Sequence, residues 1–292
     1  MNFDLNNRNY SRQSHIIINA KYALTSSEIN LILTLLTTIK KEDQEFRDYK
    51  FTLREFNNKM EKSITTKDLN ATIKSLMSKP LEIYTSEEQW KIFHWFSYFE
   101  YNNGLITCRF DKALKPYLLE LKDRFVVSDL RVILPMRSSY SKRMYLFLKE
   151  YSKIGMRTFN VEELQETLKV PKSLKNYADF KRKVLKRVET DINKFTDLEI
   201  KFIEKKRMRK VIEVTFIIKK NANDLKKFIT HIRELYVNKL LYKTPEGRGV
   251  KCSQKGLLYY SDNLENISKE ESQKMWETLH ENREALLCFE ED

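Results

Sequence analysis

The chain has 292 residues, which suits two compact units better than one, since domains most often hold roughly 100 to 150 residues. Its 54 Lys and Arg outnumber 41 Asp and Glu, and the resulting net charge of +13 favours a polyanionic partner, either nucleic acid or an anionic membrane surface. No apolar run approaches the ~20 residues of a membrane span, and the first thirty residues lack the basic start, apolar block and small-residue cleavage site typical of a signal peptide. We therefore expect a cytoplasmic protein, and of the two polyanionic partners we expect nucleic acid and no membrane.

The first half of the chain predicts three helices followed by strands. Two capping boxes, Thr25 to Glu28 and Thr52 to Glu55, each open a helix, and the first helix is expected to be largely buried and to run to about Lys41. A third helix is expected at about 66–78. Aromatic and β-branched residues then predict strands at 81–86, 89–101 and 105–110, and Asn102-Asn103-Gly104 indicates a hairpin turn.

The second half repeats this order of elements. A helix from about residue 139, a short helix opening at Asn160, a long helix at 180–195 and two strands are predicted. The two halves also share short similar sequences. FTLREF at 51–56 aligns with FNVEEL at 159–164, and PLEIYT at 80–85 aligns with DLEIKF at 197–202. Two matches in the same order indicate a duplicated unit, and each copy has the winged-helix order, a helix-turn-helix followed by a β-hairpin wing.

The predicted fold class is therefore α+β, with two tandem winged-helix domains and a C-terminal helical extension. The domains are expected at 1–135 and 136–220, joined through a linking helix within 111–138. The extension, 221–292, is expected to hold an amphipathic helix at about 223–241, a loop at 244–256 and a final helix capped by Ser268 and Glu271. Its last 28 residues carry nine acidic side chains, opposite in sign to the rest of the chain.

The helix predicted at 180–195 has two different faces. Placed at about 100° per residue, its apolar side chains fall in one sector: Phe180, Val184, Leu185, Val188, Ile192 and Phe195. The opposite sector and its flanks hold the candidate DNA-contacting residues Lys181, Arg182, Lys183, Lys186, Arg187, Thr190, Asn193 and Lys194. Such side chains hydrogen-bond to phosphates and base edges, and a major groove admits a helix.

A solvated surface helix would show the same pattern, but the segment that follows favours DNA. The stretch EKKRMRK at 204–210 places five cations at the predicted hairpin tip: Lys205, Lys206, Arg207, Arg209 and Lys210. This density of like charge is unfavourable unless a polyanion screens it. Residues 172–220 hold sixteen Lys and Arg against seven Asp and Glu, so most of the net charge lies here.

The first copy predicts a weaker DNA contact. Its third helix offers Lys67, Asn70 and Lys74 as candidate DNA-contacting residues. Its hairpin is aromatic, with Trp90, Phe93, Trp95, Phe96, Tyr98, Phe99 and Tyr101. Two interpretations remain open, a well-packed strand or a sheet edge used for self-association.

No pattern in the chain predicts catalysis. The four histidines are isolated from one another, no phosphate-binding G-x-x-x-x-G-K-[ST] occurs, and none of the fifteen tyrosines is marked out as a nucleophile. We expect a binding protein rather than an enzyme, with no catalytic residue, metal or cofactor.

Three blocks of the chain resemble the winged-helix plasmid replication initiator (Rep) proteins of the iteron-binding type. They are SHIIINAKYALTSSEINLILTLL, LKPYLLELKDRFVVSDLRVILPMRSSYSKRMYLFLKEY and YADFKRKVLKRVETDINKFTDLEIKF, and the likeness covers about 10–220. The resemblance implies that the second winged helix reads direct repeats (iterons) at a plasmid origin through its third helix, here 179–195, with a wing at 204–210. The family often has a Pro within this helix where this chain has Lys186 or Arg187, so the fine helix geometry is not transferred.

The resemblance also implies the partners. These are double-stranded origin DNA, host replication proteins such as the helicase and the initiator, and a second copy of the chain in a homodimer that represses its own promoter. Bacterial, plasmid-borne origin is implied too. Two other functions stay open, a winged-helix transcriptional repressor without a replication role and, less favoured, a nicking initiator enzyme.

Overall fold

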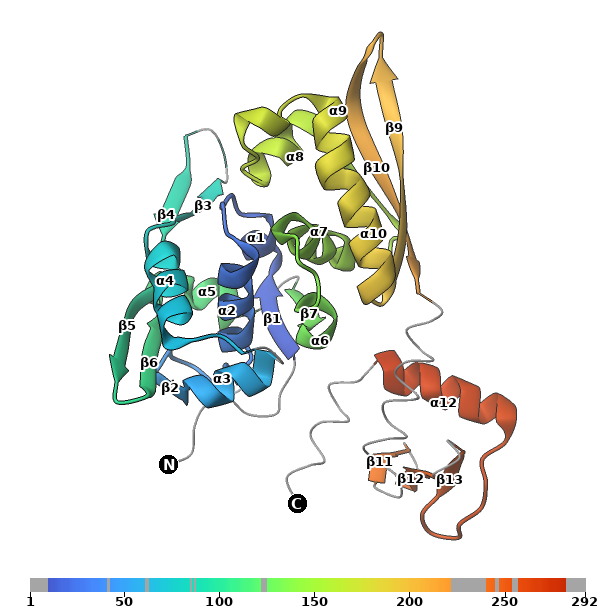
Figure 1. Ribbon diagram of the computed structural model, residues 1–292. Helices are drawn as coiled ribbons and strands as arrows, with labels where there is room; N and C mark the ends of the chain where they lie inside the picture. Colours follow the sequence, from blue (N-terminus) through green and yellow to red (C-terminus); the bar gives the residue numbers. More distant parts are fainter. Residues whose placement is uncertain are drawn as a thin grey trace. The chain divides into compact units, whose positions relative to one another are not determined.

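The computed structural model describes residues 10–40, 43–60, 63–84, 86, 88–121, 125–221, 240–244, 247–253 and 257–281. The chain divides into two compact units, residues 1–220 and 221–292 (Figure 1). None of the described helices combines the length and the apolar character needed to cross a bilayer.

The first winged-helix region starts where its capping box predicts. In α2 (Ser26–Leu36) the Thr25 hydroxyl accepts a hydrogen bond from the Glu28 N–H, and the Glu28 carboxylate accepts one from the Thr25 N–H at 2.7 Å. The helix is buried, as expected, but it ends before the predicted Lys41. The hydroxyls of Thr37 and Thr38 donate to the carbonyls of Thr34 and Leu35 and so satisfy the last turn.

Strands and two further helices complete this region: β2 (Tyr49–Thr52), α3 (Leu53–Met60), α4 (Thr66–Met77), β3 (Leu81–Tyr84), β4 (Trp90–Phe93), β5 (Phe96–Asn102) and β6 (Leu105–Phe110). The strands form an antiparallel sheet in the order β2-β6-β5 and a separate β3-β4 pair. Asn103 and Gly104 form the two-residue turn between β5 and β6 with φ of 48° and 86°. The hairpin predicted from the Asn-Gly pair is confirmed.

The segment at 111–138 differs from the single linking helix that was predicted. It holds η1 (Lys112–Leu114), α5 (Lys115–Leu118), β7 (Phe125–Asp129) and α6 (Leu130–Ile133). Strand β7 pairs with β1 (Tyr10–Ser14), and the Ser11 and Ser128 hydroxyls meet at 2.9 Å in the interior. The apolar run at Phe125 thus forms a strand because a partner strand from the start of the chain lies beside it.

The second winged-helix region repeats the helices and the three-stranded sheet of the first, but among the described residues it has no counterpart of the separate β3-β4 pair. Its elements are α7 (Ser139–Glu150), β8 (Met156–Asn160), α8 (Val161–Thr167), η2 (Lys172–Leu174), α9 (Tyr177–Phe180), η3 (Lys181–Leu185), α10 (Lys186–Phe195), β9 (Leu198–Arg207) and β10 (Lys210–Lys220). The sheet order is β8-β10-β9, so β8 pairs with the last wing strand as β2 pairs with β6.

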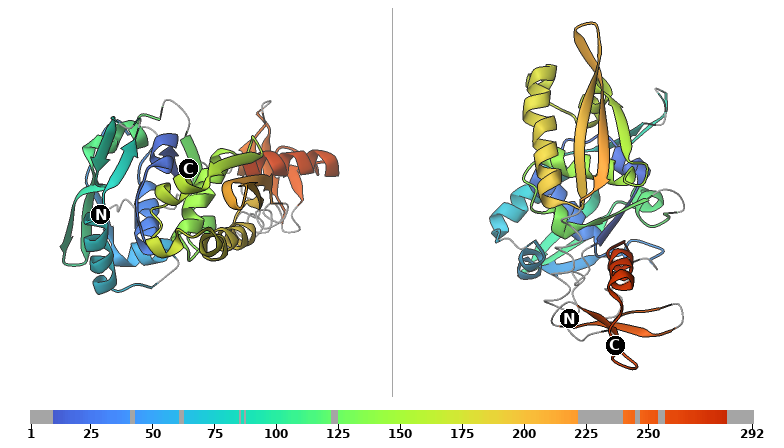
Figure 2. Two further views of the ribbon diagram at one scale, coloured as in Figure 1. Left: turned by 90° about the horizontal axis from the view of Figure 1, so that it is seen from above. Right: turned by 90° about the vertical axis from the view of Figure 1, so that its right-hand side faces the viewer.

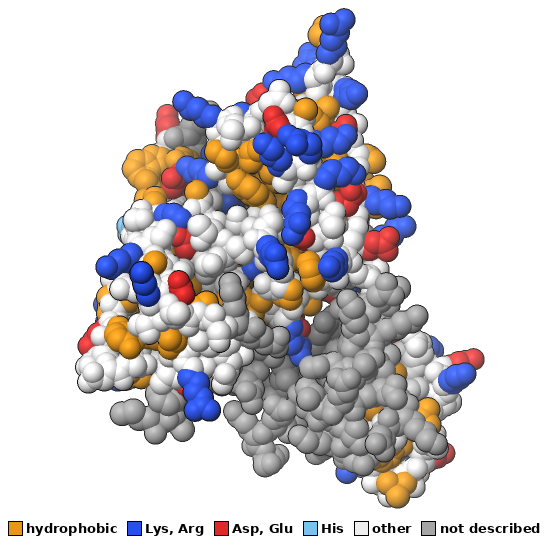
Figure 3. All heavy atoms as spheres, in the orientation of Figure 1, with side chains coloured by type: hydrophobic (Ala, Val, Ile, Leu, Met, Phe, Trp, Pro, Cys, Tyr) orange, Lys and Arg blue, Asp and Glu red, His pale blue; other side chains and the backbone are white. Residues whose placement is uncertain are grey.

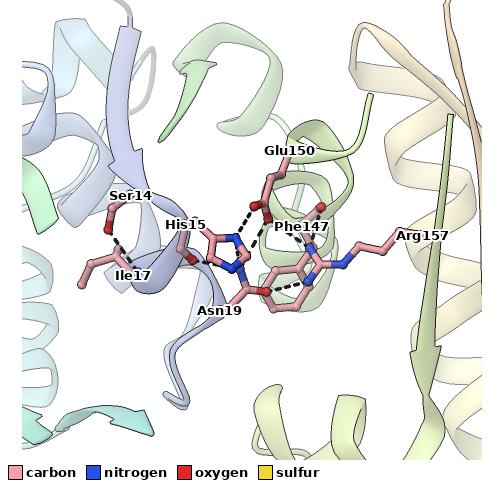
Figure 4. A network of polar contacts seen from close by, with 7 residues as sticks. All are labelled: Ser14, His15, Ile17, Asn19, Phe147, Glu150 and Arg157. Atoms are coloured by element: carbon pink, nitrogen blue, oxygen red, sulfur yellow. Dashed lines mark hydrogen bonds and ion pairs between the residues drawn. The ribbon is translucent and has the colours of Figure 1, made fainter. Parts of the chain in front are cut away.

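Helix α7 lies between the two regions and contacts α10 on one side and α1 (His15–Asn19), α2 and β7 on the other (Figure 1). Buried side chains from both regions form one continuous hydrophobic core. Arg157 of β8 donates to Asn19 Oδ1 at 2.6 Å and to the Phe147 carbonyl at 2.8 Å, and Glu150 contacts both Arg157 and His15 (Figure 4). These contacts make α7 a structural link between the regions.

The unit at 221–292 contains a sheet that was not predicted. Strands β11 (Leu240–Lys243), β12 (Gly249–Cys252) and β13 (Leu258–Tyr260) form an antiparallel sheet in that order, and α12 (Lys269–Glu281) packs with it around Trp276. The predicted final helix is confirmed, since the Ser268 hydroxyl accepts from the Glu271 N–H at 3.3 Å. The predicted loop at 244–256 includes β12, whose Val250 and Cys252 face the core. Most of the helix predicted at 223–241 lies outside the described residues, and its last residues belong to β11.

Candidate nucleic-acid interface

One long helix, formed by α9, η3 and α10 and here termed the reading helix, has the two faces that its sequence predicts. Five of its apolar side chains are at most 1% exposed: Phe180, Val184, Leu185, Val188 and Ile192. On the opposite side Arg182, Lys183, Lys186 and Thr190 are exposed. The burial of the apolar face against the core holds the cationic face outward.

The middle of the reading helix contains a π-helical turn at Lys181–Leu185. The N–H of Lys186 donates to the carbonyl of Lys181, five residues back, so this turn holds one residue more than an α-helical turn. The wider turn accommodates the neighbouring Val184 and Leu185 in the core together. It also offsets the cations before the turn from those after it, which no sequence pattern indicated.

The exposed cations of the reading helix have acidic neighbours on the same helix. Arg182 binds Asp179 at 2.7 Å, and Lys186 binds Glu189 at 2.8 Å. The hydrogen bond from Arg182 holds the pKa of the Asp179 carboxyl below its usual range. Exposed pairs of this kind contribute little to stability, so a phosphate can replace the carboxylate at little cost.

Three of the predicted DNA-contacting residues also form hydrogen bonds or ion pairs within the protein. The Asn193 amide is half-buried and bonds both the N–H of Ile200 at 2.6 Å and its carbonyl at 2.9 Å. Arg187 binds Asp191 at 2.9 Å, a carboxylate that is only 2% exposed. The Thr190 hydroxyl donates to the Lys186 carbonyl at 3.0 Å. A DNA contact by these three side chains stays a prediction.

The two remaining predicted residues, Lys181 and Lys194, lie beside the outer face of the helix. Lys181 binds Glu204 at 2.7 Å, and the Lys194 ammonium lies 5.0 Å from the centre of the Phe195 ring.

The wing is a long hairpin of β9 and β10 whose tip carries the predicted cations. Met208 and Arg209 form its two-residue turn, with Met208 at φ of 54° and 97% exposed. Lys205 pairs with Glu213 at 3.0 Å and Lys210 with Glu162 at 2.6 Å. The other tip cations are exposed: Lys206, Arg207 and Arg209. Among the described residues, Arg207 and Arg209 form no ion pair.

The tip stands clear of the domain. In Figure 2, right, the hairpin extends past the end of the reading helix, and Figure 3 shows Lys and Arg side chains gathered around that helix and at the hairpin tip. Cationic side chains thus gather both on the outer face of the reading helix and at the wing tip.

Glu204 joins the wing to the start of the reading helix. Its carboxylate accepts from the Tyr177 hydroxyl at 2.8 Å and pairs with Lys181 at 2.7 Å. Burial opposes ionisation of Glu204, but the bonds from Lys181 and Tyr177 outweigh it and keep its pKa below the usual range. Burial and the bond to Glu204 raise the pKa of Tyr177. The sequence did not predict the contact between these two residues. Its only signal was Glu204, a single acidic residue at the edge of a basic run.

The first region offers fewer cations. Lys67, Asn70 and Lys74 lie exposed on α4, whose N-terminus is closed by a Thr65 and Asp68 capping box. A contact of this helix with DNA stays a prediction.

Some aromatic residues of the first hairpin fit a well-packed strand, and others fit an exposed sheet edge. Trp95 and Phe96 are 2% and 1% exposed, as a packed strand requires, whereas Trp90 and Ile92 on β4 are 57% and 52% exposed. In the part of the chain that the structure describes, β4 pairs only with β3. Packing in the core therefore explains Trp95 and Phe96, whereas β4 is an exposed sheet edge with apolar side chains.

Two family models match the part of the chain that forms the two winged-helix regions. Residues 10–149 match the family model described as "Initiator Replication protein, WH1", and residues 160–218 match "Initiator Rep protein, WH2". Two crystal structures of domains 2 and 3 of RctB are similar, one at 10% identity over 75% of this chain and 94% of that one with a TM-score of 0.40. The other has 14% identity over 70% and 86%, with a TM-score of 0.38. The two family models together span more than half of the chain, which belongs to the winged-helix replication initiator (Rep) family of DNA-binding proteins.

Proposed function

We propose that this protein initiates plasmid replication by binding direct repeats in double-stranded origin DNA. The reading helix lies in the major groove, and the wing tip follows the backbone or the minor groove. Binding at several repeats helps to open the origin and to recruit host replication proteins such as the helicase and the initiator. The protein acts in the cytoplasm of a plasmid-bearing bacterium.

The observation that supports this proposal best is the joined cationic surface of helix and wing. Lys181 and Tyr177 at the start of the reading helix bind Glu204 on the wing strand, so the two contact elements are held at a fixed spacing. A major groove about 12 Å wide accepts a helix, and the wing tip then meets the neighbouring phosphates.

Electrostatics sets the expected dependence on salt. If helix and wing together make six to ten phosphate contacts, the affinity falls by roughly 10³ to 10⁵ between 50 and 200 mM salt. The base contacts of the exposed helix face contribute the specificity, at about 1 to 3 kcal/mol for each good pair.

The exposed edge strand β4 supports the further proposal of a second, dimeric state of the protein. The exposed Trp90 and Ile92 fit a second copy of the chain, and such a homodimer would repress its own promoter while monomers open the origin. A transcriptional repressor without a replication role uses the same helix and is the alternative function.

DNase footprinting on the DNA that flanks the gene tests the proposal. Several protected tandem repeats beside an AT-rich stretch are the expected result. A single protected inverted repeat at a promoter would favour the repressor instead. We also propose that the protein has no nicking activity, and a covalent protein–DNA adduct on supercoiled origin DNA with a divalent metal would overturn this part.

A further inference from the structure

Met208, in the turn of the wing, is the most exposed large apolar side chain among the described residues. It is 97% exposed, and the next in rank, Leu264, is 72% exposed. Single apolar side chains on a protein surface are common and need no function of their own. Met208 differs from such residues in its backbone conformation and in its charged neighbours.

The backbone of Met208 is left-handed, with φ of 54°. Gly, Asn and Asp enter this region most readily, whereas a long side chain is strained there. The β5-β6 hairpin of the first region has the favoured residues at its own two-residue turn, Asn103 and Gly104. The wing instead has a strained methionine in its turn, and strain of this kind is concentrated at functional positions.

The neighbours of Met208 are cationic. Arg207 and Arg209 flank it directly and are exposed, and Lys205, Lys206 and Lys210 follow on either side. Figure 3 shows hydrophobic atoms beside Lys and Arg side chains at the hairpin tip. An apolar surface of another protein would have to bury these charges without partners, which is unfavourable. The phosphates on the two sides of a DNA groove would neutralise them and leave the apolar side chain facing the groove.

The dimensions of DNA favour the minor groove as the place for this side chain. That groove is about 6 Å wide, so it admits a single unbranched side chain but not a whole hairpin. Arginine side chains are attracted to a narrow minor groove. Methionine is unbranched and flexible, and it is among the apolar residues that enter between base pairs from this side.

From these observations we propose that Met208 is a wedge that inserts between two base pairs from the minor groove, with Arg207 and Arg209 on the flanking phosphates. Insertion requires the DNA binding proposed above, on which this inference rests, and adds a deformation of the duplex to it. Such a wedge partly unstacks one base step and bends the duplex by roughly 20 to 90°. TA and CA steps deform most easily, so the wedge should act at a step of this kind.

Resonance energy transfer between dyes at the two ends of a duplex with one footprinted repeat tests the bend. The full chain at saturating concentration should raise the transfer efficiency above that of the free duplex. Met208→Asn removes the apolar wedge but suits the left-handed conformation, so this variant should fold, bind the duplex and lose most of the rise. Met208→Leu retains an apolar wedge and should retain most of the rise. Ile203→Thr is the matched control, because it removes an exposed apolar side chain of β9 away from the turn, and it should bend DNA as the wild type does.

The fluorescence of 2-aminopurine locates the unstacked step. This adenine analogue emits more strongly when its stacking is lost, and it is placed at one position after another along the same duplex. The wild type should raise the emission several-fold at one step, and Met208→Asn should not.

Fluorescence anisotropy on the same duplexes reports binding separately from bending. A wild-type complex without bending or unstacking would overturn the wedge and leave the DNA binding proposed above intact. The same conclusion would follow if Met208→Asn bent and unstacked the duplex as the wild type does, or if Met208→Leu lost both effects. Failure of the wild type to bind the repeat duplex at all would overturn both proposals.

Discussion

The hydroxyl of Tyr177 donates a 2.8 Å hydrogen bond to the carboxylate of Glu204 and so connects the first turn of the reading helix to the wing strand. In the proposed DNA complex, helix and wing contact different parts of the site, so their spacing would decide whether both can bind at once. We therefore expect this single side-chain bond to affect DNA recognition without contacting DNA.

Tyr177→Phe should lower DNA discrimination while leaving general DNA affinity nearly unchanged. A hydrogen bond to a charged group contributes about 1.5 to 3 kcal/mol, and we expect about 1 kcal/mol of it to appear as reduced specificity. Fluorescence anisotropy with a repeat duplex and a scrambled duplex measures the ratio. Tyr140→Phe, a half-buried tyrosine of α7, is the matched control. An equal loss of affinity on both duplexes would show that the bond does not align the helix.

Arg182→Ala and Lys186→Ala should each reduce the ratio of repeat to scrambled binding, by about 1 to 3 kcal/mol for every base that the wild-type side chain contacts. Both side chains are exposed on the outer face of the reading helix. Lys201→Ala is the control of equal charge, because Lys201 is exposed on β9 beside the inward-facing Ile200. An unchanged ratio in both helix variants would remove this helix as the reader of bases.

The double variant Arg207→Ala, Arg209→Ala should weaken binding to every sequence almost equally. Both tip residues are exposed, so the substitution should remove the phosphate contacts proposed for them without disturbing the core. The slope of log affinity against log salt should fall by about 0.9 for each phosphate that the variant no longer neutralises. Lys201→Ala with Lys219→Ala removes the same charge from exposed positions away from the tip and should change the slope little. Weaker binding confined to the repeat duplex would mean that the wing itself reads bases.

The local rules of the chain predict much of this fold. The capping boxes at Thr25 and Thr52 and the Asn103-Gly104 turn act within a few residues, and each lies where it was expected. The apolar face of the reading helix was predicted correctly as well, because burial of its apolar stripe is a property of one segment.

The features that escaped prediction depend on distant partners. Phe125–Asp129 forms strand β7 because β1 pairs with it. No local pattern in these five residues predicts that pairing. The bond of Glu204 to Tyr177 and the bonds of Asn193 to Ile200 likewise require the tertiary fold. The sequence therefore predicts the basic surface but not the tertiary hydrogen bonds that position its helix and wing.

Asn193→Ala should destabilise the second region more than it changes DNA recognition. The substitution leaves the N–H and carbonyl of Ile200 without their side-chain partner, at about 1 to 3 kcal/mol for a buried group. Chemical denaturation measures this cost. Thr190→Ala, on the same helix, removes only an exposed bond to the Lys186 carbonyl and should cost well under about 1 kcal/mol. If Asn193→Ala unfolds like the wild type but loses discrimination, the amide contacts bases rather than supporting the fold.

The half-buried Lys59 of α3 should make stability depend on alkaline pH. Burial, aided by the charge of Arg131, lowers the pKa of Lys59 from 10.5 to about 8, against the opposing effect of Asp129. Below pH 8 the folded and unfolded chains both hold the proton, and burying the charge opposes folding. Between about pH 8 and 10.5 the folded chain releases the proton before the unfolded chain does, so stability rises with pH.

Lys59→Met removes this titration and should stabilise the protein at pH 7 by about 1 to 3 kcal/mol. The advantage of the variant should shrink steadily above pH 8, since the neutral amine of the wild type no longer opposes burial. Urea denaturation of both proteins from pH 7 to 10 measures the difference and cancels the titration of other groups. Lys50→Met, at an exposed position of β2, controls for the change of net charge. Parallel stability curves for the wild type and Lys59→Met would show that Lys59 keeps its ordinary pKa.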